Sequence, residues 1–430
     1  MFIHVVKRGE TISQIAREYG TSPERIISDN ALSSLPYPVV GQALIILIPE
    51  IIHTVRSGES IFSIAQSYGI SQMSLLQKNP TLILNPTLYV GQVLTITFRD
   101  EENTPLYISG YVYPYVSQNV FIRTLPFVSE CAVFGYGFND DGSLIPPYRD
   151  NALINTIYEY NASPILLLSS IGEDGTFSTE RSSLLFNDLT LQNTVLNNLI
   201  DIMREKGYQG LDIDFEYINQ NDTAAFIRFI ENAVEKMHEY GFGVNVDLAP
   251  KTSANQQGIL YEAHDYGAIG EIADTVLLMT YEWGYTYGPP MAVAPLPAVR
   301  RVVEYAVSEI PREKIMMGIP NYGYDWQLPF ERGVTRAENI GNEGAIILAA
   351  RVGAEIEFEE KDQAPFFRYA DQNGREHEVW FEDIRSISAK YDLIREFDLR
   401  GAGYWNLMRN FNQNWAYVSH SFNVIKNEGN

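Results

Sequence analysis

Three carboxylates recur at every second position within one short stretch of this chain. The stretch runs Gly210-Leu211-Asp212-Ile213-Asp214-Phe215-Glu216-Tyr217. Successive side chains of a β-strand point to opposite faces, so Asp212, Asp214 and Glu216 share one face and the large apolar residues share the other. Crowded carboxylates on a poorly solvated face destabilise a fold, because like charges repel and burial disfavours ionisation. Such an arrangement is typical of a glycosidase, which needs one carboxyl group protonated near neutral pH beside an ionised one.

Two ordinary explanations of the same stretch stay open from the residues alone. It could be an edge strand with a solvated acidic face, or its carboxylates could bind a hard cation such as calcium or magnesium. The helix-like segment from Leu196 to Lys206 comes shortly before Gly210, which favours a buried parallel strand in a βα repeat. The chain has 6 histidines, with no pair at zinc-ligand spacing, so we expect neither a metal nor another cofactor.

The stretch resembles the motif Asp-Gly-x-Asp-x-Asp-x-Glu of family 18 of the glycoside hydrolases. Asp212, Asp214 and Glu216 match the last three acids of that motif, whereas Gln209 stands where the family usually has its first Asp. We expect Gln209 to lie at the base of the strand in a structural role. The resemblance implies a (β/α)8 barrel that hydrolyses glycosidic bonds.

The sequence after Leu106 is consistent with such a barrel, because short apolar segments alternate there with helix-like segments eight times. This alternation predicts an α/β fold over residues 106–430, a (β/α)8 TIM barrel with its active site at the carboxyl ends of the strands. A Gly- and charge-rich region at about 327–377 predicts a small α+β insertion that forms one wall of a substrate cleft. The predicted barrel strands are Tyr107–Tyr113, Cys131–Gly137, Pro164–Ser169, Gly210–Glu216, Gly243–Leu248, Thr275–Tyr281, Ile315–Pro320 and Gly401–Trp405.

Further residues that match the same family lie at the ends of these predicted strands. Met279-Thr280-Tyr281-Glu282 resembles the family's Met-x-Tyr-Asp motif, with Glu282 in place of Asp. The turn after the seventh strand, Gly318-Ile319-Pro320-Asn321-Tyr322-Gly323, also resembles the family. The resemblance implies that the substrate is bound by Trp405, Tyr111, Ser170, Glu282, Met279 and Tyr322.

The family's mechanism, carried over to these positions, implies that the nucleophile belongs to the substrate. Glu216 would protonate the glycosidic oxygen while the 2-acetamido carbonyl of the sugar attacks the anomeric carbon and forms an oxazolinium ion. Asp214 would hold the acetamido N–H, and the Tyr281 hydroxyl would orient the acetamido oxygen. Asp212, beside Tyr111 and Ser170, would share a proton with Asp214. Glu216 would then activate water, so the anomeric configuration is retained.

The N-terminal part of the chain contains an internal repeat, because residues 4–42 are echoed by residues 53–92 at an offset of 49, which becomes 50 near the end. Each copy is predicted to fold as strand, helix, helix, strand. In the first copy, Thr11 to Gln14 forms a capping box and Gly20 is a natural helix C-cap. Ser22-Pro23 begins the second helix.

These copies resemble lysin-motif (LysM) domains, which bind glycans containing N-acetylglucosamine. The resemblance places the two domains at residues 2–49 and 51–98, followed by a short acidic linker at 99–105. Two small scaffolding modules without a ligand are the alternative. If the copies bind glycan, two weak sites in tandem gain avidity on a polymer. The resemblance places the sugar against Gly9, Glu10, Thr11 and Asn30 in the first copy, and against Gly58, Glu59, Ser60 and Asn79 in the second.

The composition of the chain excludes some classes of partner. Its formal charge of −23 argues against binding to nucleic acid or to anionic membranes, and no apolar run is long enough to span a bilayer. The single cysteine, Cys131, excludes an intramolecular disulfide. The N-terminus lacks the pattern of a secretory signal peptide, so we expect a protein that is either cytoplasmic or reaches its target by another route. We expect a monomer.

The combination of two LysM domains with this barrel resembles bacterial spore cortex-lytic N-acetylglucosaminidases. The resemblance implies an enzyme of the spore that hydrolyses N-acetylglucosaminyl bonds in cortex peptidoglycan. Because the nucleophile is an acetamido group, the substrate must be peptidoglycan or a chitin-like N-acetylated glycan. Two alternatives stay open from the sequence: a chitinase that acts on chitin oligomers, and a non-catalytic glycan-binding protein.

Overall fold

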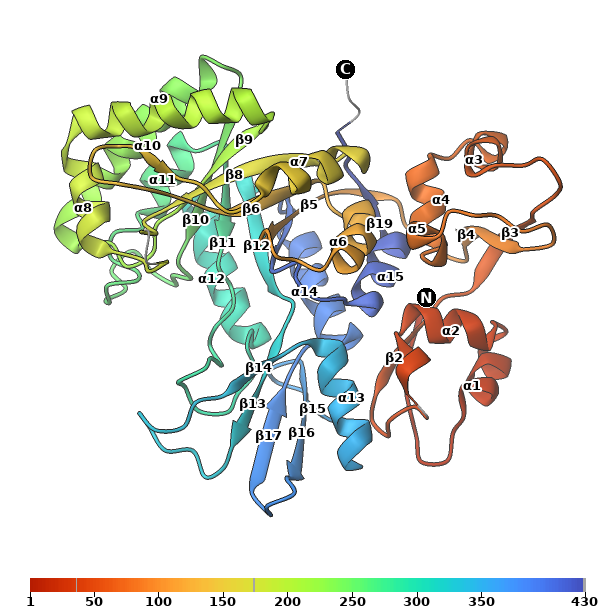
Figure 1. Ribbon diagram of the computed structural model, residues 1–430. Helices are drawn as coiled ribbons and strands as arrows, with labels where there is room; N and C mark the ends of the chain where they lie inside the picture. Colours follow the sequence, from red (N-terminus) through yellow and green to blue (C-terminus); the bar gives the residue numbers. More distant parts are fainter. Residues whose placement is uncertain (36, 173–174, 428–430) are drawn as a thin grey trace.

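The largest unit of the protein is a closed barrel of eight parallel strands, seen in a computed structural model that describes residues 1–35, 37–172 and 175–427 (Figure 1). The strand order is β5-β18-β12-β11-β10-β9-β8-β6, and pairing of β5 with β6 closes the ring. The predicted TIM barrel is therefore confirmed. The barrel strands are β5 (Thr104–Val112), β6 (Glu130–Phe138), β8 (Ser163–Ser169), β9 (Gly210–Asp214), β10 (Gly243–Leu248), β11 (Thr275–Leu278), β12 (Ile315–Pro320) and β18 (Gly401–Trp405).

Three barrel strands end earlier than the sequence predicts: β5 stops at Val112, one residue before Tyr113, and β11 and β9 stop further from their predicted ends. β11 stops at Leu278 instead of Tyr281, because the N–H groups of Thr280 and Tyr281 bond to the carbonyl oxygens two residues before them and turn the chain inward. β9 stops at Asp214, two residues before Glu216. As a result Tyr217 is not part of the apolar layer expected on the outer face, but is 49% exposed.

Helices cover the outside of the barrel, and apolar side chains of both layers form one large core (Figure 1). Alternate residues of β9 show the two faces: Leu211 and Ile213 are buried in this outer layer, while Asp212 and Asp214 point inward. The helices around the barrel are α6 (Gln118–Thr124), η2 (Leu125–Phe127), α7 (Asp150–Glu159), α8 (Thr179–Asn187), α9 (Leu189–Lys206), η3 (Gln220–Asp222), α10 (Thr223–His238), α11 (Tyr266–Ile272), α12 (Leu296–Glu309), η4 (Arg312–Lys314), α14 (Ile384–Glu396) and α15 (Asn412–Ser421). Two short strands extend the sheet, β7 (Leu144–Ile145) and β19 (Phe422–Val424).

An α+β insertion separates β12 from α14, next to the carboxyl ends of the barrel strands (Figure 1). It consists of a five-stranded sheet of antiparallel pairs and one helix, and it has its own small apolar core. The insertion occupies the region where the sequence predicts it, although its first strand begins at Gly323. Its elements are β13 (Gly323–Gln327), β14 (Glu338–Ile340), α13 (Asn342–Val352), β15 (Glu357–Glu359), β16 (Ala364–Ala370) and β17 (Glu376–Trp380).

Both N-terminal repeats fold as two helices beside a two-stranded antiparallel sheet, each around its own apolar cluster. The predicted helix ends are confirmed: Thr11 and Gln14 form the capping box, and Gly20 ends the first helix in the left-handed conformation. The elements are β1 (Phe2–Val5), α1 (Ile12–Tyr19), α2 (Pro23–Asp29), η1 (Leu32–Ser34), β2 (Ala43–Ile46), β3 (Pro49–Thr54), α3 (Ile61–Tyr68), α4 (Gln72–Lys78), α5 (Thr81–Leu84) and β4 (Val93–Phe98).

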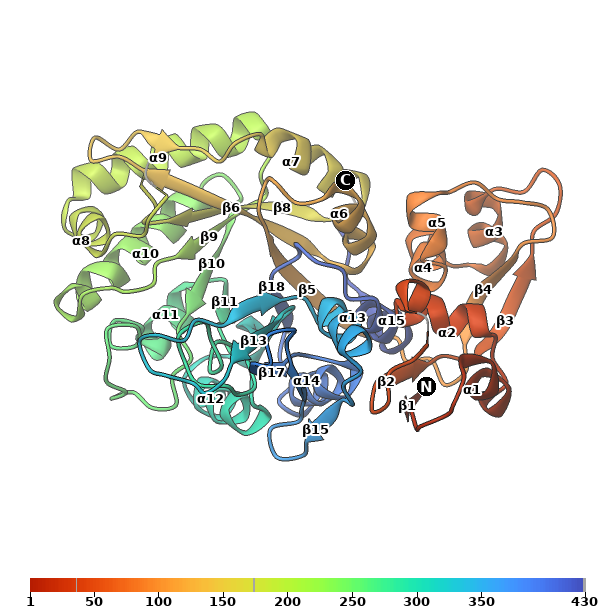
Figure 2. The same cartoon turned by 60° about the horizontal axis from the view of Figure 1, so that its bottom comes forward.

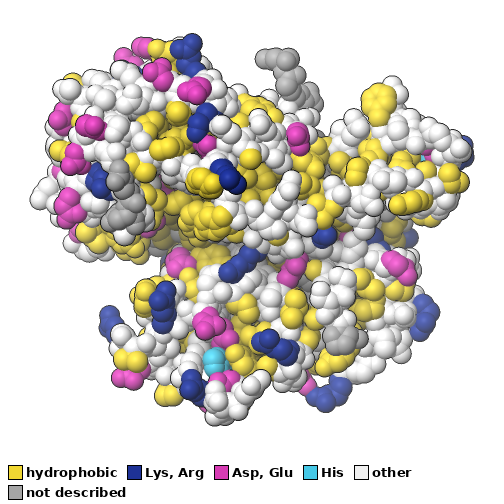
Figure 3. All heavy atoms as spheres, viewed as in Figure 1, with side chains coloured by type: hydrophobic (Ala, Val, Ile, Leu, Met, Phe, Trp, Pro, Cys, Tyr) yellow, Lys and Arg dark blue, Asp and Glu magenta, His cyan; other side chains and the backbone are white. Residues whose placement is uncertain are grey.

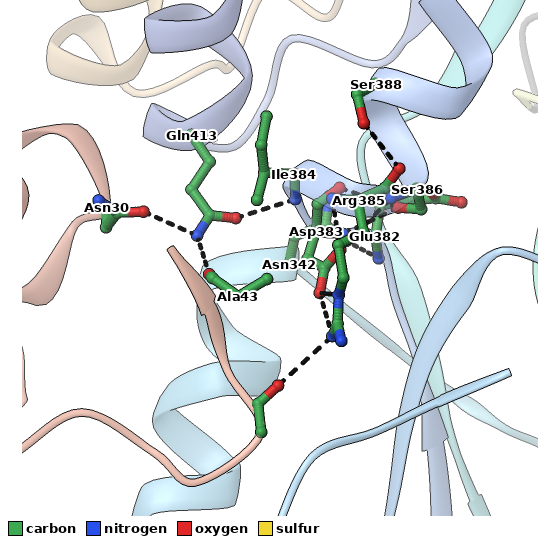
Figure 4. A network of polar contacts seen from close by, with 11 residues as sticks. Asn30, Ala43, Asn342, Glu382, Asp383, Ile384, Arg385, Ser386, Ser388 and Gln413 are labelled. Atoms are coloured by element: carbon green, nitrogen blue, oxygen red, sulfur yellow. Dashed lines mark hydrogen bonds and ion pairs between the residues drawn. The ribbon is translucent and has the colours of Figure 1, made fainter. Parts of the chain in front are cut away.

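The repeats lie together on one side of the barrel, where α2 and α4 pack against α15 (Figure 2). A buried polar network connects the first repeat to the barrel (Figure 4). Gln413 Nε2 donates to Asn30 Oδ1 and to the Ala43 carbonyl oxygen, and its Oε1 accepts from the Ile384 N–H. Because every polar group of Gln413 is bonded, this contact holds the first repeat in one orientation.

In the described residues, every helix falls short of the length and apolar character that crossing a membrane requires.

Candidate active site

The inner face of β9 and β10 carries a buried cluster of acids. Asp212 and Asp214 lie on β9, and Asn245 and Asp247 lie on β10, where Asn245 is the register partner of Asp212. Asn245 Nδ2 donates to Asp212 Oδ1 at 2.6 Å and to Asp247 Oδ1 at 3.1 Å. The Tyr111 hydroxyl donates to Asp247 Oδ1 at 2.6 Å. One asparagine and one tyrosine therefore hold two carboxylates of the cluster in place.

Burial makes these acids hard to ionise together. It raises the pKa of Asp212 to about 7, although the hydrogen bond from Asn245 favours its charged form. The pKa of Asp214 is raised well above its usual range by burial and then by the charges of Glu216 and Asp212. Burial also raises the pKa of Asp247, and the charges of Asp212 and Asp214 raise it further. The cluster therefore retains protons that isolated carboxyl groups would release.

Glu216 lies two residues beyond the end of β9 and lines a cleft of about 550 Å³. Burial raises its pKa, and the nearby charge of Glu282 raises it further. A carboxyl group that is accessible from the cleft and has a raised pKa is a suitable general acid. Figure 3 shows the molecule hollowed between the barrel above and the insertion below, with hydrophobic side chains at the edges. The cleft is lined by Tyr113, Phe134, Phe177, Asp214, Glu216, Tyr217, Asp247, Pro250, Leu260, Tyr261, Met279, Tyr281, Glu282, Trp283, Tyr285 and Trp405.

Aromatic rings form an apolar wall in this cleft. The Trp405 ring centroid lies 5.5 Å from that of Tyr111, 6.0 Å from that of Tyr113 and 5.6 Å from that of Phe134. Trp405 ends β18, and Tyr113 directly follows β5. Tyr111, on β5, is buried behind the rings that line the cleft. Flat apolar surfaces of this kind suit a sugar ring, whose C–H groups pack against aromatic faces.

The segment after β11 brings the predicted Met279, Tyr281 and Glu282 to the same cleft. Tyr281 is 8% exposed, and burial followed by the charge of Asp247 raises its pKa well above the usual value, so its hydroxyl stays a donor. Glu282 adopts φ 66°, and its carboxylate accepts hydrogen bonds from Tyr322 and from Tyr324, the latter at 3.0 Å. Glu282 therefore points toward the insertion side of the cleft.

Ser170 lies elsewhere than the sequence predicts. It was expected beside Asp212, but its Oγ accepts from the Ser178 N–H at 3.3 Å and it lines a small hollow with Glu216. The neighbouring Ser169 is the register partner of Asp214 on the inner face, and it is fully buried. β8 ends at Ser169, so the alternation of faces turns Ser169 inward and leaves Ser170 in the following loop.

Gln209 lies at the opposite end of the barrel from Glu216. It lines a hollow at the amino ends of the strands, and its Nε2 donates to the Tyr158 hydroxyl at 2.6 Å. Gln209 therefore connects the residue before β9 to α7, far from the cleft.

Several of the predicted glycan-binding residues of the repeats have structural contacts. Asn30 and Asn79 are buried, and their amide groups bond to the backbone of the closing strand at Ile45 and Thr95. These two side chains therefore cannot reach a glycan, which corrects the prediction for both. Their reappearance in each copy reflects the fold of the repeat.

The first strand–helix loop is built in the same way in both copies. Glu10 accepts from the Lys7 N–H at 2.7 Å and contacts His4, and Glu59 does the same with Arg56 and His53. Thr11 and Ser60 are helix N-caps. Gly9 and Gly58 have φ values of 86° and 82°, which favour glycine. Contact of these six residues with sugar stays a prediction.

The sequence reasoning missed Asn245, Asp247 and His264. The first two follow the same pattern as Asp212 and Asp214, since polar residues alternate with apolar ones in Gly243-Val244-Asn245-Val246-Asp247-Leu248. His264 has no comparable pattern, because it lies in the loop after β10 and only the fold brings it to Phe215, directly past the end of β9.

Comparisons with known proteins agree with this geometry. The family described as Glycosyl hydrolases family 18 matches residues 110–410, and the LysM domain matches residues 4–47 and 53–97. The chain is 42% identical to the cortical fragment-lytic enzyme of Bacillus subtilis over 429 residues, which cover 99% of each chain.

Solved structures give the same result. The crystal structure of the Bacillus cereus spore cortex-lytic enzyme SleL superposes with a TM-score of 0.85 at 35% identity, covering 100% of this chain and 99% of the other. The Bacillus megaterium SleL structure gives 0.83 at 38% identity, covering 99% and 98%. With the acid cluster, the raised pKa of Glu216 and the matching barrel and repeats, this chain belongs to family 18 of the glycoside hydrolases and carries two LysM domains at its N-terminus.

Proposed function

We propose that this enzyme is a retaining N-acetylglucosaminidase that hydrolyses N-acetylglucosaminyl bonds in spore cortex peptidoglycan. The observation that carries the proposal is the position of Glu216, which lines an aromatic cleft beside buried acids and has a raised pKa. The substrate is supported by the similarity, over nearly the full length of both chains, to a cortical fragment-lytic enzyme of Bacillus subtilis. By the same similarity, the protein acts in the bacterial spore.

The reaction begins with proton transfer from the Glu216 carboxyl group to the glycosidic oxygen. As the bond to the leaving sugar breaks, the carbonyl oxygen of the substrate's 2-acetamido group attacks the anomeric carbon and forms an oxazolinium ion. The acetamido N–H donates to Asp214, whose Oδ1 lacks a hydrogen-bond partner among the described residues and whose side chain lines the cleft. The Tyr281 hydroxyl donates to the acetamido oxygen and orients it.

The second half of the reaction restores the enzyme. The Glu216 carboxylate takes a proton from water as the water oxygen attacks the anomeric carbon on the face that the leaving sugar vacated. The oxazoline ring opens, the acetamido group reforms, and the product keeps the original configuration. Asp212 and Asp247 hold protons within the buried cluster during this cycle, which limits the negative charge beside Glu216.

The LysM domains anchor the enzyme to insoluble glycan in this proposal. The exposed loops of both copies present Thr11 and Ser60 to solvent. Two such sites on one polymer raise the local concentration of the barrel at its substrate.

An assay of paired substrates tests the nucleophile directly. Soluble peptidoglycan fragments are prepared with their N-acetylglucosamine residues either intact or chemically de-N-acetylated. We expect cleavage of the intact fragments alone, because an amine has no carbonyl oxygen that could attack. Equal rates on both preparations would contradict substrate-assisted catalysis.

The variant Glu216→Gln tests the acid in the same assay. We expect kcat to fall by roughly a thousandfold or more, with substrate binding retained, because glutamine cannot donate the proton. Glu180→Gln, which neutralises an exposed carboxylate in the first turn of α8, is the matched control and should leave the rate unchanged.

A further inference from the structure

A histidine outside the acid cluster links the catalytic strand to the wall of the cleft. His264 is 1% exposed, and its Nε2 lies 3.2 Å from the Phe215 carbonyl oxygen. The Ala249 N–H donates to His264 Nδ1 at 2.9 Å. Phe215 lies between Asp214 and Glu216, directly past the end of β9, and Ala249 directly follows β10. One imidazole therefore bridges two strand ends that flank the site.

The hydrogen bonds fix the tautomer of this imidazole. Because Nδ1 accepts from a backbone N–H, the single proton of the neutral ring lies on Nε2, which donates to the Phe215 carbonyl. Burial lowers the pKa of His264 to about 4, and the charge of Lys251 lowers it as well, against the hydrogen bond to Phe215. The ring is therefore neutral near pH 7, as this pair of contacts requires.

Three further residues hold the histidine in place. Lys251 Nζ donates to the His264 carbonyl oxygen at 2.8 Å, and the Lys251 N–H donates to the Tyr266 hydroxyl at 3.0 Å. The Tyr266 hydroxyl donates to the Ala249 carbonyl oxygen at 2.5 Å. We call these four residues, Ala249, Lys251, His264 and Tyr266, the histidine clamp. The loop between its ends carries cleft-lining residues Pro250, Leu260 and Tyr261.

The position of the Phe215 carbonyl matters for catalysis because its carbon is bonded to the backbone nitrogen of Glu216. A rotation of this peptide plane moves the Glu216 side chain relative to Asp214. β9 ends at Asp214, so the Phe215 carbonyl lies beyond the paired part of the strand and depends on contacts from outside the sheet. A displacement of about 1 Å in a catalytic group costs about a hundredfold in rate.

We propose that His264 is a positioning residue for the general acid. Its Nε2–H holds the Phe215 carbonyl and so fixes the backbone that carries Glu216 against the loop that forms the cleft wall. The inference rests on the proposed role of Glu216 as the general acid.

Two substitutions of His264 separate the contact with Phe215 from the contact with Ala249. The amide of glutamine reaches the position of Nε2 and keeps a donor for the Phe215 carbonyl. The amide of asparagine reaches only the position of Nδ1 and keeps an acceptor for the Ala249 N–H. We expect kcat on a soluble fluorogenic glycoside of an N-acetylglucosamine disaccharide to fall tenfold or more in His264→Asn. In His264→Gln we expect kcat within threefold of the parent, with KM within twofold in both variants.

The Glu216→Gln background distinguishes positioning from a general loss of structure. If His264 acts through Glu216, adding His264→Asn to Glu216→Gln changes the residual rate by less than twofold, because the positioned acid is already absent. A further tenfold loss in the double variant would overturn the proposal, as would equal losses of kcat in the asparagine and glutamine variants.

Folding and the identity of the acid are controlled separately. His238 ends α10, is half-exposed and contacts Asp274. The variant His238→Asn should leave kcat unchanged. Thermal unfolding of each variant reports its fold, and if His264→Asn does not fold, a tenfold loss of kcat in His264→Gln would overturn the proposal. An undiminished rate in Glu216→Gln would instead contradict the proposed acid and leave the clamp without a catalytic group to position.

Discussion

At the scale of single residues, the site contains several buried acids, which a fold selected for stability alone would avoid. Asp212, Asp214 and Asp247 are buried within one barrel, and each has a raised pKa. Burial of acids disfavours their ionised forms and weakens the folded state at neutral pH. The barrel tolerates this because its outer layer supplies a large apolar core. The buried acids therefore lower stability locally, at the inner face of the barrel.

The first prediction concerns the dependence of stability on pH. The folded protein keeps the Asp212 proton up to about pH 7, whereas the unfolded chain releases it near pH 4. The native state thus binds more protons, so the free energy of unfolding falls as pH rises from 4 to 7. Asp212→Asn should remove this loss and raise the free energy of unfolding by about 1 to 3 kcal/mol at pH 8, with little change at pH 4. Urea unfolding of the parent and of Asp212→Asn at pH 4 and pH 8 tests this prediction. An equal change in the free energy of unfolding at both pH values would contradict it.

The second prediction concerns Glu282 and the pH dependence of catalysis. The charge of Glu282 helps to raise the pKa of Glu216, so Glu282→Gln should lower that pKa. A general acid works in its protonated form, and the basic limb of the kcat/KM profile should therefore move to lower pH. The profile of Glu180→Gln serves as the reference. If the basic limb of the profile stays in place in Glu282→Gln, the charge of Glu282 does not raise the pKa of Glu216.

At the scale of elements, the periodicity of the sequence predicts the barrel well, because alternation and apolar runs directly reflect which faces are buried. The eight strands lie where the pattern places them, and Asp214, Tyr281 and Trp405 reach one cleft. Strand ends are harder to predict. For example, β11 stops three residues before the predicted end. β8 does end at Ser169 as predicted, but only its register with β9 shows that Ser169, and not Ser170, faces inward.

Contacts between segments far apart in the sequence are also hard to predict. His264 reaches Phe215 across 49 residues, and no local pattern announces it. In the repeats, the resemblance to LysM domains implied that Asn30 and Asn79 contact the ligand, but both side chains bond to the closing strands instead. Identity between repeats therefore reports the shared fold as readily as a shared ligand.

The third prediction follows from the role of Asn79. Its side chain makes three hydrogen bonds, to the carbonyl oxygens of Leu75 and Thr95 and from the Thr95 N–H. Asn79→Ala leaves buried backbone groups unpaired and should destabilise the protein by about 2 kcal/mol. Binding of the folded variant to insoluble peptidoglycan should not change. Asn85→Ala, at an exposed position of the same repeat, should affect neither property. Loss of peptidoglycan binding by folded Asn79→Ala would contradict this and indicate that Asn79 contacts the glycan directly.

At the scale of the whole molecule, the two repeats are part of one packed body. Ile83 and Phe98 of the second repeat belong to the core that fills the barrel's outer layer, and Lys78 forms a buried ion pair with Glu101 in the linker. The first repeat contacts the insertion, where the Ile356 N–H donates to the Val40 carbonyl oxygen at 2.9 Å. The repeats and the cleft therefore keep a fixed geometry relative to each other. If the repeats bind glycan, a strand bound there reaches the cleft at a set distance.

The fourth prediction uses a matched pair of glycines in the two repeats. Gly41 and Gly91 occupy equivalent positions, with φ values of 82° and 88°. A Cβ atom at Gly41 would lie 1.8 Å from the Ile356 carbonyl oxygen, whereas one at Gly91 would have no atom within 4 Å. Both alanine variants carry a backbone strain of about 1 kcal/mol, and Gly41→Ala should lose about 1 kcal/mol or more in addition, through disrupted docking. Thermal unfolding of the two variants tests this, and equal stabilities would contradict tight docking of the first repeat.

The measurement that most directly tests the function is mass spectrometry of the reducing ends released from purified spore cortex, with chitin oligomers digested in parallel. The account predicts new N-acetylglucosamine reducing ends from cortex, and none from cortex treated with Glu216→Gln. Reducing ends of muramic acid, or cleavage of chitin alone, would contradict it.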